Sequence, residues 1–320
     1  MREIVRLITV PEERRDGRWL EEGLQAAIQL EMSTIPPYLY AAWSIDENID
    51  PSDTRGDILE IAREEMLHMG IACNLLAAVG GDPRILQIAP SYPTRLPKDI
   101  HEDLPVALEP LSRDLLLNTF MAIEEPVAHV VEHSEFVPSG STLIGDFYDK
   151  IQQAFETRIP VLSTTRQVNL RSFSKGTFIM ASVDDVRKGI DLIKRQGEGT
   201  AAAPFEASNP DELAHFYQFG EIAHGHRLTR TAPFTYTGEM VEMPGVREVA
   251  PADRTQPEAS EFNQLYTDML GDLERAWDGG GTAMLTAAVG KMFRLAGVAK
   301  QLFQGDVGPG FIVVDDSGNR

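Results

Sequence analysis

Three segments with helical periodicity each carry one glutamate on a face that is otherwise apolar. These segments span residues 18–46, 54–80 and 111–133. Positions three or four apart share a face of a helix, and on that basis Glu31, Glu65 and Glu124 interrupt the three apolar stripes. Each one alone could be a buried acid that bonds to a hydroxyl or an arginine. Three together would repel one another unless a cation bridges them, and the stripes hold no Lys or Arg, so we predict a metal site.

Histidines strengthen this interpretation because they recur three residues after a glutamate. The pairs are Glu65 with His68, Glu212 with His215, and Glu221 with His224. A Glu and a His three positions apart on one helix can ligate one cation, as in the two-metal sites of helical bundles. The pair at 221 and 224 lies about half a helical turn out of phase with the pair at 212 and 215, so we assign it to the flank.

The identity of a fourth glutamate ligand stays open between two residues. Spacing favours Glu212, because it stands three residues before His215 on an expected helix that starts at Asn209 and Pro210. Glu198 is the alternative, because it lies between glycines in "RQGEGT", where the backbone can approach a ligand or a metal closely. In contrast, Glu64 groups with Asp57 and Glu60 and is expected on a polar flank.

Composition limits the classes of partner. The 320 residues carry a formal net charge of -20, which argues against binding to nucleic acid or to an anionic membrane surface. Cys73 is the one cysteine, so no internal disulfide is expected. The amino terminus shows no apolar signal-peptide core, and no apolar run approaches the length of a membrane span. We therefore expect a cytoplasmic protein.

The helical patterns predict an all-α fold in two parts. Residues 1–230 are expected to form a four-helix bundle that holds the metal site. Residues 231–320 are expected to add an irregular segment and two helices joined by "DGGG". A proline-rich stretch at 84–110 is expected to be a long loop that gates a pocket. Pro36 and Pro37 should kink or widen the first helix beside Glu31 and open room for a substrate, or simply bend the helix around the core.

Several stretches together resemble one family of enzymes. They are "LEMSTIPPYLYAAWSI", "AREEMLHMGIACNLLAAVGGDPRI", "MAIEEP", "RQGEGT" and "AHFYQFGEI". The combination is similar to the ferritin-like domains of iminophenylpyruvate dimer synthases, which couple oxidised aromatic amino acids in bisindole pigment biosynthesis. The likeness runs from about residue 15 to residue 225, with further pieces beyond. This chain is much shorter than those enzymes, so shared chemistry need not mean a shared substrate.

The resemblance implies a ferritin-like bundle with a two-metal carboxylate site. Carried over by motif, the ligands are Glu31, Glu65, His68, Glu124, Glu198 and His215, with Glu212 as the alternative to Glu198. Oxygen and imidazole ligands suit two iron ions, with manganese as the alternative. Tyr38 lies seven residues after Glu31 on the same face and is the candidate catalytic residue, expected to hydrogen-bond a ligand carboxylate. It could equally be a core aromatic residue whose hydroxyl is satisfied elsewhere.

The expected function is a metal-dependent oxidoreductase, an oxidase, an oxygenase or an imine dimer synthase. Its partners would be O2 or peroxide and a small organic substrate, possibly derived from an amino acid, in specialised metabolism. The alternatives are an iron-storage protein, a peroxide disproportionation enzyme like manganese catalase, and a helical partner protein with a vestigial site. A homo-oligomer is compatible with each of them.

Overall fold

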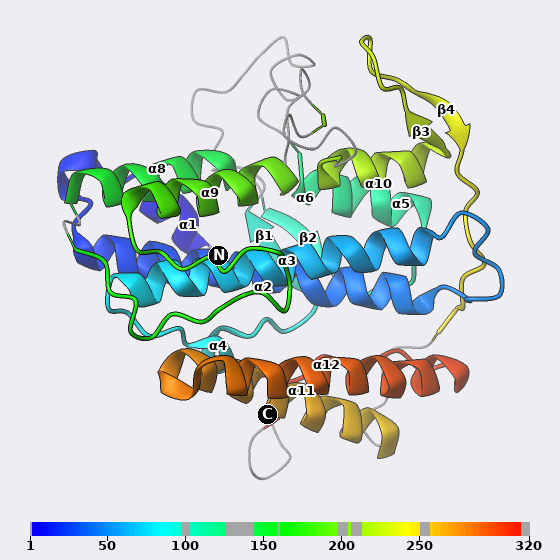
Figure 1. Ribbon diagram of the computed structural model, residues 1–320. Coiled ribbons are helices and arrows are strands. Elements are labelled where there is room, and N and C mark those ends of the chain that lie inside the picture. The colour runs from blue at the N-terminus through cyan, green and yellow to red at the C-terminus, as the bar shows by residue number, and fades with distance from the viewer. Residues whose placement is uncertain are drawn as a thin grey trace.

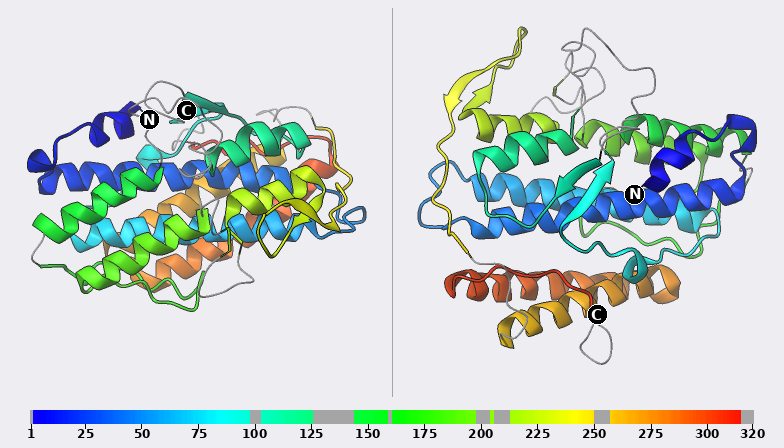
Figure 2. Two further views of the ribbon diagram at one scale, coloured as in Figure 1. Left: turned by 90° about the horizontal axis from the view of Figure 1, so that it is seen from above. Right: turned by 180° about the vertical axis from the view of Figure 1, so that it is seen from behind.

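A computed structural model describes residues 2–97, 103–125, 144–158, 161–197, 204–205, 213–249 and 257–314. Helices dominate these parts of the chain and lie in three layers (Figure 1). Two long helices, α2 (Gly17–Ser44) and α3 (Thr54–Ala78), form the middle layer. Shorter helices cover one side of this pair, and α11 with α12 cover the other side, as the rear view in Figure 2 also shows. The expected all-α class is therefore confirmed.

Local capping explains where the two central helices begin. The Asp16 carboxylate accepts a hydrogen bond from the Trp19 backbone N–H at the start of α2. The two carboxylate oxygens of Asp50 accept from the backbone N–H groups of Thr54 and Arg55 at the start of α3. The predicted helix at 54–80 ends at Ala78, just before Gly80, which adopts a φ of 91°.

Helix α2 continues through Pro36 and Pro37 without interruption. Pro37 has no N–H for the carbonyl of Ser33, four residues earlier. The Tyr92 hydroxyl donates to that Ser33 carbonyl at 2.9 Å and replaces the missing helical hydrogen bond. The helix accommodates the two prolines because the side chain of Tyr92, which lies just before residues 94–97, bonds to the carbonyl that Pro37 leaves free.

The first outer layer consists of two interrupted helices. Its elements are α5 (Arg113–Leu115), the π-turn η2 (Leu116–Phe120), α6 (Met121–Ile123), α8 (Ile144–Arg158), α9 (Val183–Gly197) and α10 (His215–His224). Seen from above in Figure 2, α8 follows the line of α5 and α6, while α9 and α10 follow a parallel line. With α2 and α3 they make a four-helix arrangement in which two of the helices are broken.

Two predicted helix bounds are wrong. The helix expected to run unbroken to His133 stops at Ile123, and Glu124 already has a φ of -91° and a ψ of 8°. Residues 126–133 of that prediction lie outside the described residues. Pro126 follows in the sequence, and the residue before a proline avoids helical backbone. The helix expected to run unbroken from residue 209 is interrupted at Leu213, which forms an isolated antiparallel bridge with Phe205, and α10 begins at His215. Residues 209–212 lie outside the described residues.

The second outer layer is a helical hairpin formed by α11 (Pro257–Arg275), the π-turn η3 (Ala276–Gly280) and α12 (Gly281–Gln304). Gly279 and Gly281 adopt φ values of 92° and 58°, which explains the glycines of the predicted "DGGG" connection. Asn74, fully buried in α3, accepts a hydrogen bond from the Trp277 indole at 2.8 Å. This contact anchors the hairpin to the middle layer.

Small elements complete the described chain. They are α1 (Arg2–Ile8), η1 (Glu12–Arg14), α4 (Ile85–Ile88), β1 (Thr94–Pro97), β2 (Asp103–Val106), β3 (His226–Leu228) and β4 (Tyr236–Met240). Strands β1 and β2 pair antiparallel with Thr94 opposite Val106, so the stretch expected to be a structureless gate contains a hairpin. None of the helices in the ranges described above has the length and apolar character needed to cross a membrane.

Candidate metal centre

Five of the predicted ligands come together in the interior of the bundle. Glu31 extends from α2, Glu65 and His68 from α3, Glu124 follows the last residue of α6, and His215 is the first residue of α10. All five side chains are buried. They form two groups that share Glu65, and within each group the ligand atoms lie within 4.8 Å of one another. Glu65 is thus common to both groups.

Both imidazoles present Nδ1 to the carboxylates. In the first group, His68 Nδ1 lies 3.7 Å from Glu31 Oε2 and 3.6 Å from Glu65 Oε1. In the second group, His215 Nδ1 lies 2.9 Å from Glu65 Oε1 and 3.7 Å from Glu124 Oε2. The two rings stack with their centroids 5.7 Å apart, one in each group.

The opposite nitrogens of the two histidines are joined by a chain of hydrogen bonds. His68 Nε2 lies 2.9 Å from Gln196 Oε1, and Gln196 Nε2 donates to Glu64 Oε1 at 3.1 Å. His215 Nε2 lies 2.8 Å from Glu64 Oε2. With protons on both Nε2 atoms, every contact in the chain has one donor and one acceptor, and both Nδ1 atoms keep a lone pair for a metal.

Three hydroxyls orient the carboxylates. The Tyr38 hydroxyl donates to Glu124 Oε1 at 2.6 Å. The Tyr148 hydroxyl donates to Glu31 Oε1, and the Thr34 hydroxyl donates to Glu65 Oε2 at 3.1 Å. Each of the three carboxylates therefore has one oxygen fixed by a hydroxyl, and the bond expected of Tyr38 is present.

The buried carboxylates and imidazoles of this cluster hold protons tightly when no metal is present. Burial raises the pKa of Glu31 to about 7. Burial alone would lower the pKa of His68, but the neighbouring Glu65 and Glu31 outweigh it and raise this pKa to about 10. Burial would likewise raise the pKa of Glu65, yet His68 and His215 hold it below its ordinary value. Protons on the histidines therefore compensate the carboxylates, and a metal ion would take their place.

Donor chemistry supports the fit of metal ions to these residues. His215 Nδ1 is buried and makes no hydrogen bond of good geometry, although Glu65 Oε1 lies close to it. A buried nitrogen without a hydrogen bond, aimed at two carboxylates, is what an imidazole ligand presents before it binds a metal. Carboxylate and imidazole donors suit iron and manganese.

The remaining predicted glutamates, Glu198, Glu212 and Glu221, are not among the clustered ligands that the structure describes. Glu198 and Glu212 both lie outside the described residues. Gly197 precedes Glu198 and ends α9, and a Cβ at this glycine would lie 3.3 Å from Glu124 Oε2, so the backbone does approach the cluster closely there. Glu221 is buried but outside the cluster, where it accepts from Arg227 Nη1 at 2.6 Å and from the Leu228 backbone N–H at 2.7 Å.

Three residues of the centre were not expected from the sequence. Glu64 was expected on a polar flank, but it is buried because α9 and α10 pack on that side of α3. Gln196 and Tyr148 carried no motif signal, although Tyr148 lies one turn from Ile151 and Ile144 on the apolar face of α8. The acidic neighbours at 64 and 65 thus divide their roles between holding a histidine and serving both groups.

The space beside the cluster is small in the described part of the chain. A cavity of about 30 Å³ borders Glu31, Glu65, His68 and Glu124, which is room for little more than water. The larger space next to Pro36 lies on another face of α2, away from the cluster. The prediction that the prolines open substrate room beside the metals is therefore wrong, because Pro36 faces α11 and α12.

Comparisons with known proteins agree with this architecture. The family described as Ferritin-like matches residues 24–224. A protein of Chromobacterium violaceum named 2-imino-3-(indol-3-yl)propanoate dimerase is 31% identical over 254 residues, which is 67% of this chain and 24% of that protein. The chain thus spans about a quarter of the length of this curated relative.

A solved structure supports the fold independently. A ferritin-like protein from Caulobacter vibrioides aligns with a TM-score of 0.66 and 24% sequence identity, covering 91% of this chain and 96% of that one. The matched family region contains all five clustered residues, from Glu31 to His215. The chain belongs to the ferritin-like family, and an imine dimerase is among its distant relatives.

Proposed function

We propose that this protein is a dinuclear metal oxidoreductase that acts on a small organic substrate. The observation that carries the proposal is the sharing of Glu65 between two buried carboxylate and imidazole groups. Glu31, Glu65 and His68 would hold one ion, and Glu65, Glu124 and His215 the other. Two iron ions held there would supply the transfer of electrons from the substrate to O2 or peroxide.

The chain's own residues keep the ligands in place. Tyr38 and Tyr148 fix one oxygen each of Glu124 and Glu31, which leaves the second oxygen of each carboxylate for an ion. Through their Nε2 contacts, Gln196 and Glu64 hold both imidazoles with Nδ1 toward the centre. Tyr38 contacts a ligand rather than a reacting atom, so the proposal gives it a positioning role.

The substrate class is proposed from the relative's name. That relative is named as a dimerase of 2-imino-3-(indol-3-yl)propanoate, and we propose an amino-acid-derived imine as the substrate of this chain too. Oxidative coupling of two such imines removes two hydrogen atoms in total, and O2 or peroxide accepts them.

Metal titration tests the proposal. Under anaerobic conditions we expect two Fe(II) ions to bind per chain. Glu65→Ala should lose both because it removes the shared ligand, whereas Glu31→Ala and Glu124→Ala should each lose one. Glu60→Ala, on the same helix as Glu65 but exposed, is the control. Unchanged binding of two ions by Glu65→Ala would refute the shared site.

A second measurement separates enzyme from storage. The iron-loaded protein is mixed with O2 or peroxide and with imines generated from aromatic amino acids. Consumption of the oxidant that depends on the imine, with coupled product, supports the proposed reaction. Uptake of many iron ions per chain with O2 and no organic product would instead indicate storage.

A further inference from the structure

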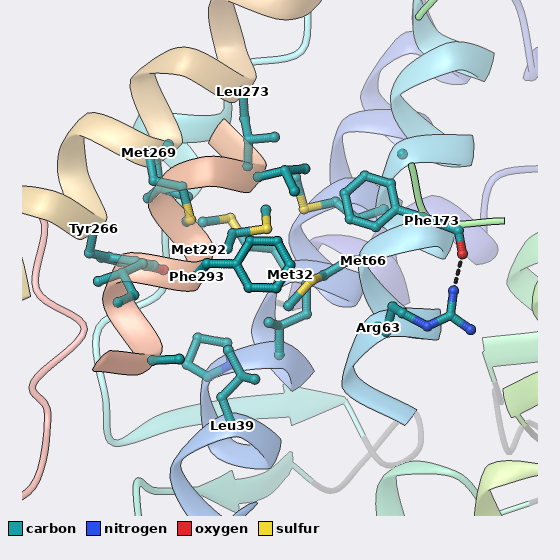
Figure 3. Close-up of a pocket in the computed structure, with 18 of the residues that line it drawn as sticks. Met32, Leu39, Arg63, Met66, Phe173, Tyr266, Met269, Leu273, Met292 and Phe293 are labelled. Atoms are coloured by element: carbon teal, nitrogen blue, oxygen red, sulfur yellow. Dashed lines mark hydrogen bonds between the residues drawn. The ribbon is translucent and has the colours of Figure 1, made fainter. Parts of the chain in front are cut away.

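A second pocket lies on the side of the α2 and α3 layer that faces α11 and α12. Its volume is about 340 Å³, within the range of small-molecule pockets. Figure 3 shows side chains from both layers pointing into it, among them Met32, Met66, Tyr266, Met292 and Phe293. This pocket is more than ten times larger than the cavity at the metal cluster.

The wall is apolar and adaptable. Its five methionines are Met32, Met66, Met69, Met269 and Met292, and its aromatic side chains include Phe173, Tyr266, Trp277 and Phe293. Thioether side chains are flexible and polarisable and contact ring edges favourably, so such a wall suits a ring-containing ligand. Water would find few hydrogen-bond partners in it.

The charges at the edge of the pocket are already compensated. Two arginines line it. Arg55 pairs with Glu47 at 3.3 Å, and Arg63 donates to Glu60 and to the Phe173 carbonyl. No other cationic side chain lines the pocket within the described residues. A ligand carboxylate would compete with these partners, and a neutral ligand would not.

Phe293 marks the mouth of the pocket. Its side chain is 77% exposed, although it lies among the pocket residues in Figure 3. A large apolar side chain exposed beside an apolar pocket gains burial when a ligand enters.

The pocket lies back to back with the metal cluster. Met32 directly follows Glu31, Met66 follows Glu65, and Met69 follows His68. Successive helical residues point about 100° apart, so each pair directs one side chain to the cluster and the next to the pocket. The two spaces are therefore separated by the α2 and α3 layer itself.

We propose that this pocket is a second ligand site, distinct from the metal centre, that binds a neutral apolar molecule of two or three rings. The size of the pocket, its methionine and aromatic wall and the paired arginines each favour this class of ligand. The inference does not depend on the proposed redox function, because none of the candidate metal ligands lines the pocket.

Fluorescence titration of the metal-free protein with N-phenyl-1-naphthylamine, a neutral probe, tests this proposal. We expect saturable binding of one probe per chain. Val289 lines the pocket, and Val289→Phe should weaken binding at least about tenfold because the added ring occupies the space. Ala287→Phe, on the exposed side of the same helix, should bind the probe like the wild type.

Two results would overturn the proposal. One is the absence of saturable binding to the wild type, and the other is wild-type affinity in a folded Val289→Phe protein. If that variant does not fold, a crystal soaked with iodobenzene replaces it. Anomalous iodine signal beside Met66 and Met292 supports the site, and signal found only elsewhere contradicts it.

Discussion

Replacement of Glu64 by glutamine should weaken one of the two metal ions selectively. In the native chain, Glu64 accepts from His215 Nε2 and from Gln196 Nε2, one bond at each carboxylate oxygen. A glutamine has only one oxygen, so its NH2 group must face one of these two donors. With the Gln196 amide in its present orientation, the variant therefore cannot satisfy both neighbours when His215 carries its proton on Nε2.

The conflict arises only when metal is bound. Without metal, His215 of the variant can give up its Nε2 proton, keep the proton on Nδ1 beside Glu65 Oε1 at 2.9 Å, and accept from the new amide through Nε2. A metal on Nδ1 forces the proton back to Nε2, where two donors then meet. A buried donor without an acceptor costs about 1–3 kcal/mol. Loss of such a supporting bond typically lowers metal affinity about 10–100-fold, which is the same range.

Competition between the protein and a chromophoric chelator for Fe(II), under anaerobic conditions, measures both affinities. We expect one ion to bind about 10–100-fold more weakly in Glu64→Gln, and the other to change much less because His68 keeps its contact with Gln196. Glu60→Gln, one turn away with its side chain 52% exposed, is the matched control. Wild-type binding of both ions by Glu64→Gln, or an equal loss of affinity in Glu60→Gln, would refute this role of Glu64.

Three further outcomes are expected. Tyr38→Phe and Tyr148→Phe should each weaken the binding of a different ion by about tenfold, because each removes the hydroxyl that holds one carboxylate. In the same competition assay, an equal loss of both ions in either variant would contradict this. Metal binding near pH 7 should release protons, because the raised pKa of His68, about 10, keeps this residue protonated without metal. The metal affinity should therefore rise with pH. Calorimetry in buffers of different ionisation enthalpy measures the protons released, and a release of none would contradict the prediction. Asn74→Ala removes four hydrogen bonds to Val168, Phe178 and Trp277 and should lower the free energy of unfolding by at least about 3 kcal/mol in urea denaturation, whereas a loss below about 1 kcal/mol would contradict the anchoring role.

Helical periodicity located much of the centre because it reports which face of a helix is apolar. Glu31 and Glu65 stood out as charged positions on such faces, in helices whose bounds were nearly right. Glu124 was found in the same way, although its helix ends one residue before it. The pattern therefore identifies a buried carboxylate even where the end of the helix is misjudged.

Other features could not be read from periodicity. Glu64 shares its turn with exposed acids, and only the packing of α9 and α10 on that side makes it buried. The pairing of β1 with β2 includes Pro97 and Pro105, and the proline content of this stretch alone suggested a loop. The proposed ligand pocket is formed between helices more than 200 residues apart, such as α2 and α12, so no local pattern contains it.

The two halves of the centre differ in how firmly the backbone holds them. Glu31, Glu65 and His68 lie in the interiors of long unbroken helices, where any displacement would break several backbone hydrogen bonds. Glu124 and His215 stand at a helix end and a helix start, where the chain can adjust at little cost. Both groups are already assembled, but an ion in the first group would meet ligands held firmly by helix interiors, whereas its partner would meet two ligands held at helix ends. The pair would then load in a fixed order, and the ion that enters last would be the first to leave.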